Sequence, residues 1–173
     1  MDDCVEKMTA YRRSCFAPYP ADADLPAQYN GYMHANWELP QTDRLLKQID
    51  RTAELGLPYF VVDAGWFCRG DRDFWPILGD WLHPEEPFSM PLKEIFDRAR
   101  AKGLKCGLWI EIEDVGTECA ALPRLGSMLM KSGGTSVCEN NRYFLDFSLR
   151  ETQEYATEVV GFLVEKYGGE YFK

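Results

Sequence analysis

Short apolar runs alternate with amphipathic helical patterns along this chain, and that alternation constrains the fold more than any other feature. Residues 57–63 (LPYFVVD) form a continuous apolar run, which is typical of a parallel strand buried on both faces. Residues 104–111 (LKCGLWIE) form another run, and residues 31–38 (GYMHANWE) and 170–173 (EYFK) are shorter extended stretches. Because helical patterns separate these stretches, the sequence predicts an α/β fold of βαβ units with a parallel sheet and right-handed crossovers.

Each of the three helices expected between the strands has a candidate N-cap. Thr42 and Ser89 stand before apolar stripes of helical period, and Ser148 forms an S-x-x-E capping box with Glu151. Gly56 and Gly103 follow the first two stripes, where a glycine commonly ends a helix. The three helices are expected at residues 40–56, 90–103 and 148–169.

The chain fits a single domain preceded by a lead-in. Its 173 residues and 46% hydrophobic content support one sizeable core. Residues 1–30 include the proline-rich stretch FAPYPADADLP and are expected to form an irregular linker, with a short helix near residues 5–13. Residues 31–173 are expected to form the domain, with a short helical stretch at 120–131 and an extended piece at 142–148.

Charge, cysteines and histidines exclude several classes of partner. A net charge of −9 disfavours nucleic acid and anionic membrane surfaces, and no apolar run is long enough to span a bilayer. The six cysteines lack CxxC spacing, so we expect reduced thiols in a cytoplasmic protein and no zinc ribbon. His34 and His83 have no HxH or HExxH partner, and we predict no metal and no cofactor.

Polar and aromatic side chains gather at the carboxyl ends of the expected strands, where parallel sheets bind their ligands. Asp63 ends a buried strand, so its carboxylate needs donors from loop amides or from a ligand's hydroxyl groups. Trp66 fits a sugar contact and a core plug equally well, whereas Trp81 follows the turn Gly79-Asp80, which favours ligand contact. The residues at these ends are Trp37, Glu38, Asp63, Trp66, Trp109, Glu111, Glu113 and Lys173.

Glu111 and Glu113 point the same way if the third strand persists, because side chains alternate along a strand. Such a pair could perform acid/base work, bind a divalent metal, or form salt bridges with basic residues at the rim of the sheet. We favour the salt bridge for Glu113.

Six motifs occur along the chain in the order NWE, VVDAGWF, LGDW, GLWIEIE, YFLDFS and YFK. Together they resemble the catalytic barrel of the α-galactosidase (melibiase-type) glycoside hydrolases, from Met33 to Lys173. The resemblance implies a (β/α)8 TIM barrel. A complete barrel needs about 250 residues, so this chain would supply roughly the first four βα units.

The resemblance also implies roles at a pocket for a terminal galactose. By position in the motifs, the residues expected to bind the sugar are Trp37, Asp63, Trp81, Trp109 and Lys173, with Glu38, Trp66 and Glu111 as further candidates. Ala64 stands where many members have a second aspartate, which leaves the exact sugar open. Ile112 replaces a proline and should change local rigidity more than chemistry.

No catalytic residue is expected within the chain. The family's nucleophile is the aspartate two residues after the lysine matched by Lys173, and its acid/base aspartate follows later. The expectation is therefore a fragment of a retaining α-galactosidase that is inactive by itself. Three alternatives remain: an α-glycosidase for a different sugar, a non-catalytic half-barrel that binds sugar or pairs with a second copy through open strand edges, and a barrel enzyme using Asp63, Glu111 and Glu113 as metal ligands.

Overall fold

A four-stranded parallel sheet forms the centre of the computed structural model, which describes residues 2–15, 26–34, 39–68 and 73–173. The strands lie in the order β1-β2-β3-β9, and each neighbouring pair is parallel. Gly107 allows the last pairing, because a Cβ there would lie 2.7 Å from the Tyr171 carbonyl oxygen. The predicted parallel α/β fold is confirmed. The strands are β1 (Gln28–Asn30), β2 (Tyr59–Val62), β3 (Lys105–Leu108) and β9 (Tyr171–Phe172).

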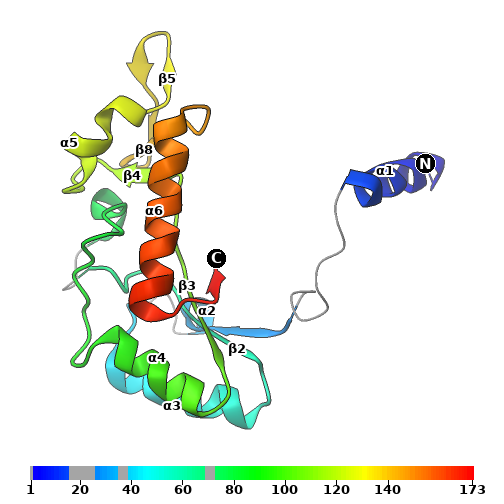
Figure 1. Ribbon diagram of the computed structural model, residues 1–173, viewed down its shortest axis with the longest axis vertical. Coiled ribbons are helices and arrows are strands. Elements are labelled where there is room, and N and C mark those ends of the chain that lie inside the picture. The colour runs from blue at the N-terminus through cyan, green and yellow to red at the C-terminus, as the bar shows by residue number, and fades with distance from the viewer. Residues whose placement is uncertain (1, 16–25, 35–38, 69–72) are drawn as a thin grey trace.

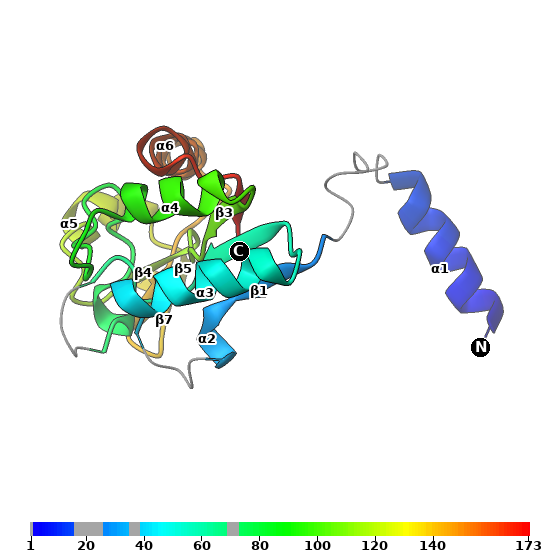
Figure 2. The same cartoon turned by 90° about the horizontal axis from the view of Figure 1, so that it is seen from below.

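Three long helices connect and cover these strands, at the positions that the periodicity predicted. Helix α3 packs against α4 and β2, while α4 packs against β3 and α6 (Figures 1 and 2). Phe60 and Cys106 contribute to the core cluster that these helices bury, and both side chains are fully buried. The helices are α3 (Thr42–Glu54), α4 (Leu92–Ala101) and α6 (Arg150–Tyr167).

A small antiparallel module interrupts the βαβ pattern between β3 and α6. Its three-stranded sheet has the order β4-β8-β7, and a separate two-stranded hairpin, β5-β6, extends from it near the N-terminal end of α6 (Figure 1). The module comprises β4 (Asp114–Gly116), α5 (Leu122–Leu125), η2 (Gly126–Met128), β5 (Lys131–Ser132), β6 (Thr135–Ser136), β7 (Cys138–Glu139) and β8 (Arg142–Phe144). Another 3-10 turn, η1 (Trp75–Ile77), lies in the long connection after β2.

The first strand lies earlier than the sequence predicted. Strand β1 occupies Gln28–Asn30, inside the expected lead-in, and residues Gly31–His34 form the short helix α2. Pairing with β2 and stacking of the Tyr29 ring on Phe60, with centroids 5.8 Å apart, place the strand there. Trp37 and Glu38, expected at the end of this strand, lie outside the described residues.

The three predicted N-caps are wrong, because Thr42, Ser89 and Ser148 do not occupy the N-cap positions and their groups make other hydrogen bonds. Helix α3 begins after Gln41, and the Thr42 hydroxyl accepts a bond from the Ser89 amide instead. Helix α6 begins after Leu149, and the Ser148 hydroxyl donates to Asp146. At the start of α4, a carboxylate oxygen of Glu86 accepts from the Leu92 amide.

The lead-in contains the expected helix, α1 (Asp2–Cys15), whose described side chains are exposed. All six cysteines are free thiols; Cys68, Cys106 and Cys119 are buried. Within the described ranges, no helix has the length and apolar character needed to cross a membrane.

Candidate functional site

Asp63 lies at the centre of a polar site where three strand ends meet. It follows β2 directly, and only 5% of its surface is exposed. One carboxylate oxygen, Oδ2, accepts from Lys173 Nζ at 2.7 Å and from Asn30 Nδ2 at 2.5 Å. The other oxygen, Oδ1, accepts from the Ala64 amide at 2.7 Å. The structure therefore brings the predicted residues Asp63 and Lys173 into direct contact, with Asn30 as a third member.

Sequence reasoning missed Asn30 because it placed the first strand too late. Asn30 is the last residue of β1, so it occupies a carboxyl strand end like Asp63 and Lys173. Its side-chain oxygen also accepts from the Tyr32 amide at 3.1 Å, which orients the amide group toward Asp63. An earlier strand boundary in the sequence would have identified Asn30 by the same rule that identified Asp63.

The Asp63 carboxylate keeps hydrogen-bonding capacity for a ligand. An ionised carboxylate offers about four acceptor positions, and donors from the described residues occupy three of them. Lys173 is 43% exposed along its side chain, so its ammonium group can also donate to a molecule outside the protein. Burial, followed by the nearby charge of Asp63, raises the pKa of Tyr32, which keeps that phenol protonated and able to donate.

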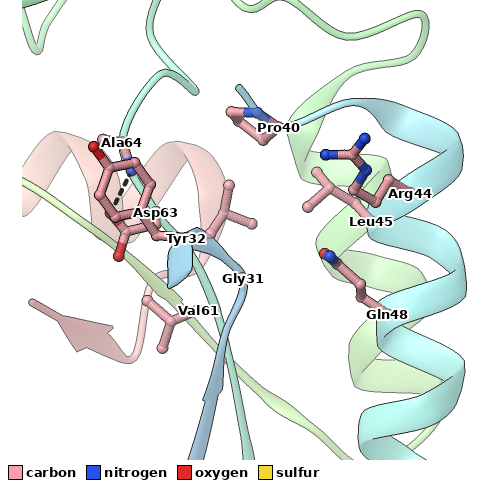
Figure 3. Close-up of a pocket in the computed structure, with 10 residues that line it drawn as sticks. Gly31, Tyr32, Pro40, Arg44, Leu45, Gln48, Val61, Asp63 and Ala64 are labelled. Carbon is pink, nitrogen blue, oxygen red and sulfur yellow. Dashed lines mark hydrogen bonds between the residues drawn. The ribbon is translucent and has the colours of Figure 1, made fainter. Parts of the chain in front are cut away.

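A pocket beside Asp63 is too small for a sugar ring. Figure 3 shows Tyr32 close to Asp63 on one side of it and Arg44 and Gln48 of α3 on the other. Its volume of about 20 Å³ is enough for one water molecule. The partly exposed side chain of Lys173 is not among the residues that line this pocket.

The tryptophans near the site form a packed aromatic cluster. Trp66 and Trp81 are fully buried, with ring centroids 6.0 Å apart. Trp66 Nε1 donates to the Trp109 carbonyl oxygen at 2.8 Å, which fixes the indole within the core. Trp81 also offers no exposed face for the ligand contact that its turn position favoured, because Phe67 and Trp109 pack on it. Trp109 follows β3 and is 9% exposed.

A second charged cluster lies beyond the end of β3. Arg142 of β8 forms ion pairs with Glu111 and, at 3.3 Å, with Asp114, and its guanidinium lies 4.5 Å from the Trp75 ring centroid. The salt bridge that we favoured for Glu113 is thus made by Glu111. Burial is the main cause that raises the pKa of Asp114 to about 6, although Arg142 acts to lower it.

Sequence reasoning missed Arg142, Asp114 and Trp75, because the antiparallel pairing of β4 with β8 brings Arg142 to Asp114, and the packing of η1 against β4 brings Trp75 to them. The three proposed metal ligands do not gather, since Asp63 and Glu111 belong to separate ion-pair networks. Across the part of the chain that the structure describes, no group of three or more His, Cys, Asp or Glu residues is placed to hold a metal ion.

Comparison with known proteins assigns the family. The family model described as Melibiase matches residues 11–173. The chain belongs to the melibiase family. The resemblance inferred from the six motifs is therefore confirmed.

This melibiase chain is similar to α-galactosidases from several bacteria. It is 33% identical to α-galactosidase Mel36A of Lactobacillus acidophilus, in a match covering 69% of this chain and 17% of that protein. It is 26% identical to an α-galactosidase of Escherichia coli, with 76% and 18% covered. The crystal structure of α-galactosidase AgaA from Geobacillus stearothermophilus superposes with a TM-score of 0.73 at 24% identity, covering 87% of this chain and 21% of AgaA. The melibiase chain thus spans about a fifth of the length of these relatives.

Proposed function

We propose that this chain forms the sugar-binding edge of an α-galactosidase barrel and contributes the first four strands of that barrel, with the three helices that connect them. One observation carries the proposal: Asn30, Asp63 and Lys173 meet at the carboxyl ends of β1, β2 and β9, and Trp109 follows the remaining strand, β3. The four parallel strands also pair in chain order, as successive strands of a (β/α)8 barrel do.

The site's chemistry suits recognition of the hydroxyl groups of a sugar. The buried Asp63 carboxylate would accept bonds from hydroxyl groups, and the Lys173 ammonium would donate to hydroxyl oxygens. Trp109, which is 9% exposed, would lie beside the bound sugar at the end of β3. AgaA variants have been crystallised with raffinose and stachyose, and we propose terminal α-galactosides as the substrate class here. Ala64 supplies no second carboxylate at this rim.

Among the described residues, the groups that contact the Asp63 carboxylate are Asn30, Ala64 and Lys173, and none of them supplies a second carboxylate at this site. A retaining glycosidase needs a nucleophile and an acid/base about 5–5.5 Å apart across the scissile bond. Asp63 is engaged by Lys173, and Glu111 is engaged by Arg142. We therefore assign this chain to substrate binding and propose that it does not turn over substrate by itself.

Hydrolysis of para-nitrophenyl α-galactoside tests whether this chain binds substrate without hydrolysing it. The complete barrel containing this chain should release nitrophenol, and the isolated chain should not. In the complete barrel, Asp63→Asn should lower kcat/KM by about 10–100-fold, because a charge-assisted hydrogen bond contributes about 1.5–3 kcal/mol. Asp50→Asn is the matched control, since Asp50 lies in α3 and pairs with Lys102.

Two results would overturn the proposal. Turnover by the isolated chain would refute its assignment to binding alone. Failure of the complete barrel to cleave any α-glycoside would refute the enzymatic assignment altogether.

We also propose that the isolated chain pairs with a second copy through its open sheet edges. Among the described strands, β1 and β9 each have one neighbour, and an unpaired edge exposes backbone donors and acceptors. Light scattering should then report a dimer mass, whereas a strict monomer at high concentration would refute this pairing.

A further inference from the structure

We propose that Arg142 is a positioning residue that holds the Trp109 indole at the carboxyl end of β3. Its guanidinium ties together three segments that meet only in the tertiary structure: the connection after β3, strand β4 and the 3-10 turn η1. The importance of Trp109 for sugar binding rests on the proposed function, but the positioning of its ring does not.

The contacts of Arg142 reach Trp109 from two directions. Through Nη1 it pairs with Glu111, two residues after Trp109, and with Asp114 at the start of β4. Through its planar face it stacks on Trp75, at 4.5 Å from the ring centroid. The Trp75 ring in turn meets Trp109 edge to face, with centroids 6.1 Å apart and an interplanar angle of 79°. The chain segment and the ring of Trp109 are therefore both restrained by one side chain.

Burial makes these contacts effective. The side chains of Arg142, Glu111 and Asp114 are 18%, 24% and 5% exposed, so solvent screens their charges only weakly. A guanidinium is suited to this position because it can pair with carboxylates through its fork and stack on an indole through its face. A lysine ammonium could keep the charge but not both geometries.

The cluster of Arg142, Glu111 and Asp114 also contains buried polar atoms that have no hydrogen-bond partner in the described part of the chain, which a cluster that serves only stability would avoid. Among the described residues, Asp114 Oδ1 and Arg142 Nε are buried without a hydrogen-bond partner. Such atoms cost stability, and apolar side chains of similar volume would avoid that cost. This unfavourable arrangement favours a positioning role for the arginine over simple packing.

The test uses 19F NMR of the 173-residue chain labelled with 5-fluorotryptophan. Its five tryptophans give five resonances, which single Trp→Phe substitutions assign. Arg142→Met should shift and broaden the resonances of Trp75 and Trp109 more than those of Trp66 and Trp81, which contact Trp109 but not Arg142. Arg142→Lys should leave the Trp109 resonance displaced in the same direction, because the ammonium cannot restore the stack.

Arg124→Met is the matched control, because Arg124 also stacks on a ring, that of Tyr155 at 5.3 Å, without contacting Trp109. It should leave the Trp109 resonance unchanged. If Arg142→Met unfolds the chain, Glu111→Gln removes one restraint more gently and should displace the same resonance by a smaller amount. An unmoved Trp109 resonance in folded Arg142 variants, or equal movement of all the tryptophans, would overturn the inference.

Adding methyl α-galactoside separates this inference from the proposed function. A sugar-dependent shift of Trp109 that the Arg142 variants weaken would support both. If the Arg142 variants move Trp109 but sugar does not, the positioning role stands and the sugar-binding assignment of Trp109 fails.

Discussion

Replacing Asp63 by alanine removes the acceptor that joins three strand ends. The Ala64 amide, the Asn30 side chain and the Lys173 ammonium all donate to this carboxylate. Because Asp63 is 5% exposed, water has little access to the space that the substitution creates. We therefore expect a loss of stability as well as a loss of binding chemistry.

The magnitude follows from the environment of each donor. The amide of Ala64, a residue 3% exposed, becomes a buried unsatisfied group and costs about 1–3 kcal/mol. Lys173 is 43% exposed along its side chain, so its pair contributes at most about 1 kcal/mol after solvent screening. Asn30 is partly buried and can turn toward water, which limits its loss to about 0.5–1 kcal/mol. Asp63→Ala should thus lower the free energy of unfolding by about 3 kcal/mol.

Urea unfolding followed by tryptophan fluorescence measures this change. With a slope of about 2 kcal/mol/M, a loss of about 3 kcal/mol lowers the urea midpoint by about 1.5 M. Asp50→Ala, which removes a surface pair with Lys102, should stay within about 0.5 kcal/mol of the parent chain. If Asp63→Ala unfolds at the same urea concentration as Asp50→Ala, the carboxylate does not join the strand ends as the structure shows.

Two further predictions concern the surroundings of Trp109. The pKa of Asp114 is raised from 3.8 to about 6, so the folded chain binds this proton more tightly than the unfolded chain does. The stabilisation from this proton is full below about pH 4 and is lost as the pH rises through 6. The free energy of unfolding should therefore fall between pH 4 and pH 7. Asp114→Asn should reduce that fall by up to about 3 kcal/mol. In urea unfolding, Trp66→Phe should lower the free energy of unfolding by about 1 kcal/mol more than Trp81→Phe does. The reason is that Trp66 Nε1 donates to the Trp109 carbonyl, whereas Trp81 Nε1 has no partner among the described residues. Equal losses would show that this bond does not contribute to stability.

The central strands and the long helices were predictable because their patterns are local. Strands β2 and β3 read as continuous apolar runs since both faces of a parallel strand are buried. Strand β1 was placed wrongly because its three residues, Gln28–Asn30, carry no apolar run and pair only because β2 lies beside them. The capping predictions failed for a related reason, since the hydroxyls of Thr42 and Ser148 found partners that local sequence does not specify.

The sequence by itself determined the family, the parallel strand-helix order and the place of Asp63 and Lys173 at the ends of strands, because each depends on motifs or on local apolar patterns. The tertiary structure decided which groups meet. It placed Asn30 on the Asp63 carboxylate, buried Trp66 and Trp81, and joined Glu111 to Arg142 across 31 positions of the chain. Contacts of this kind depend on strand register and on the packing of distant segments, which periodicity and spacing along one chain do not encode.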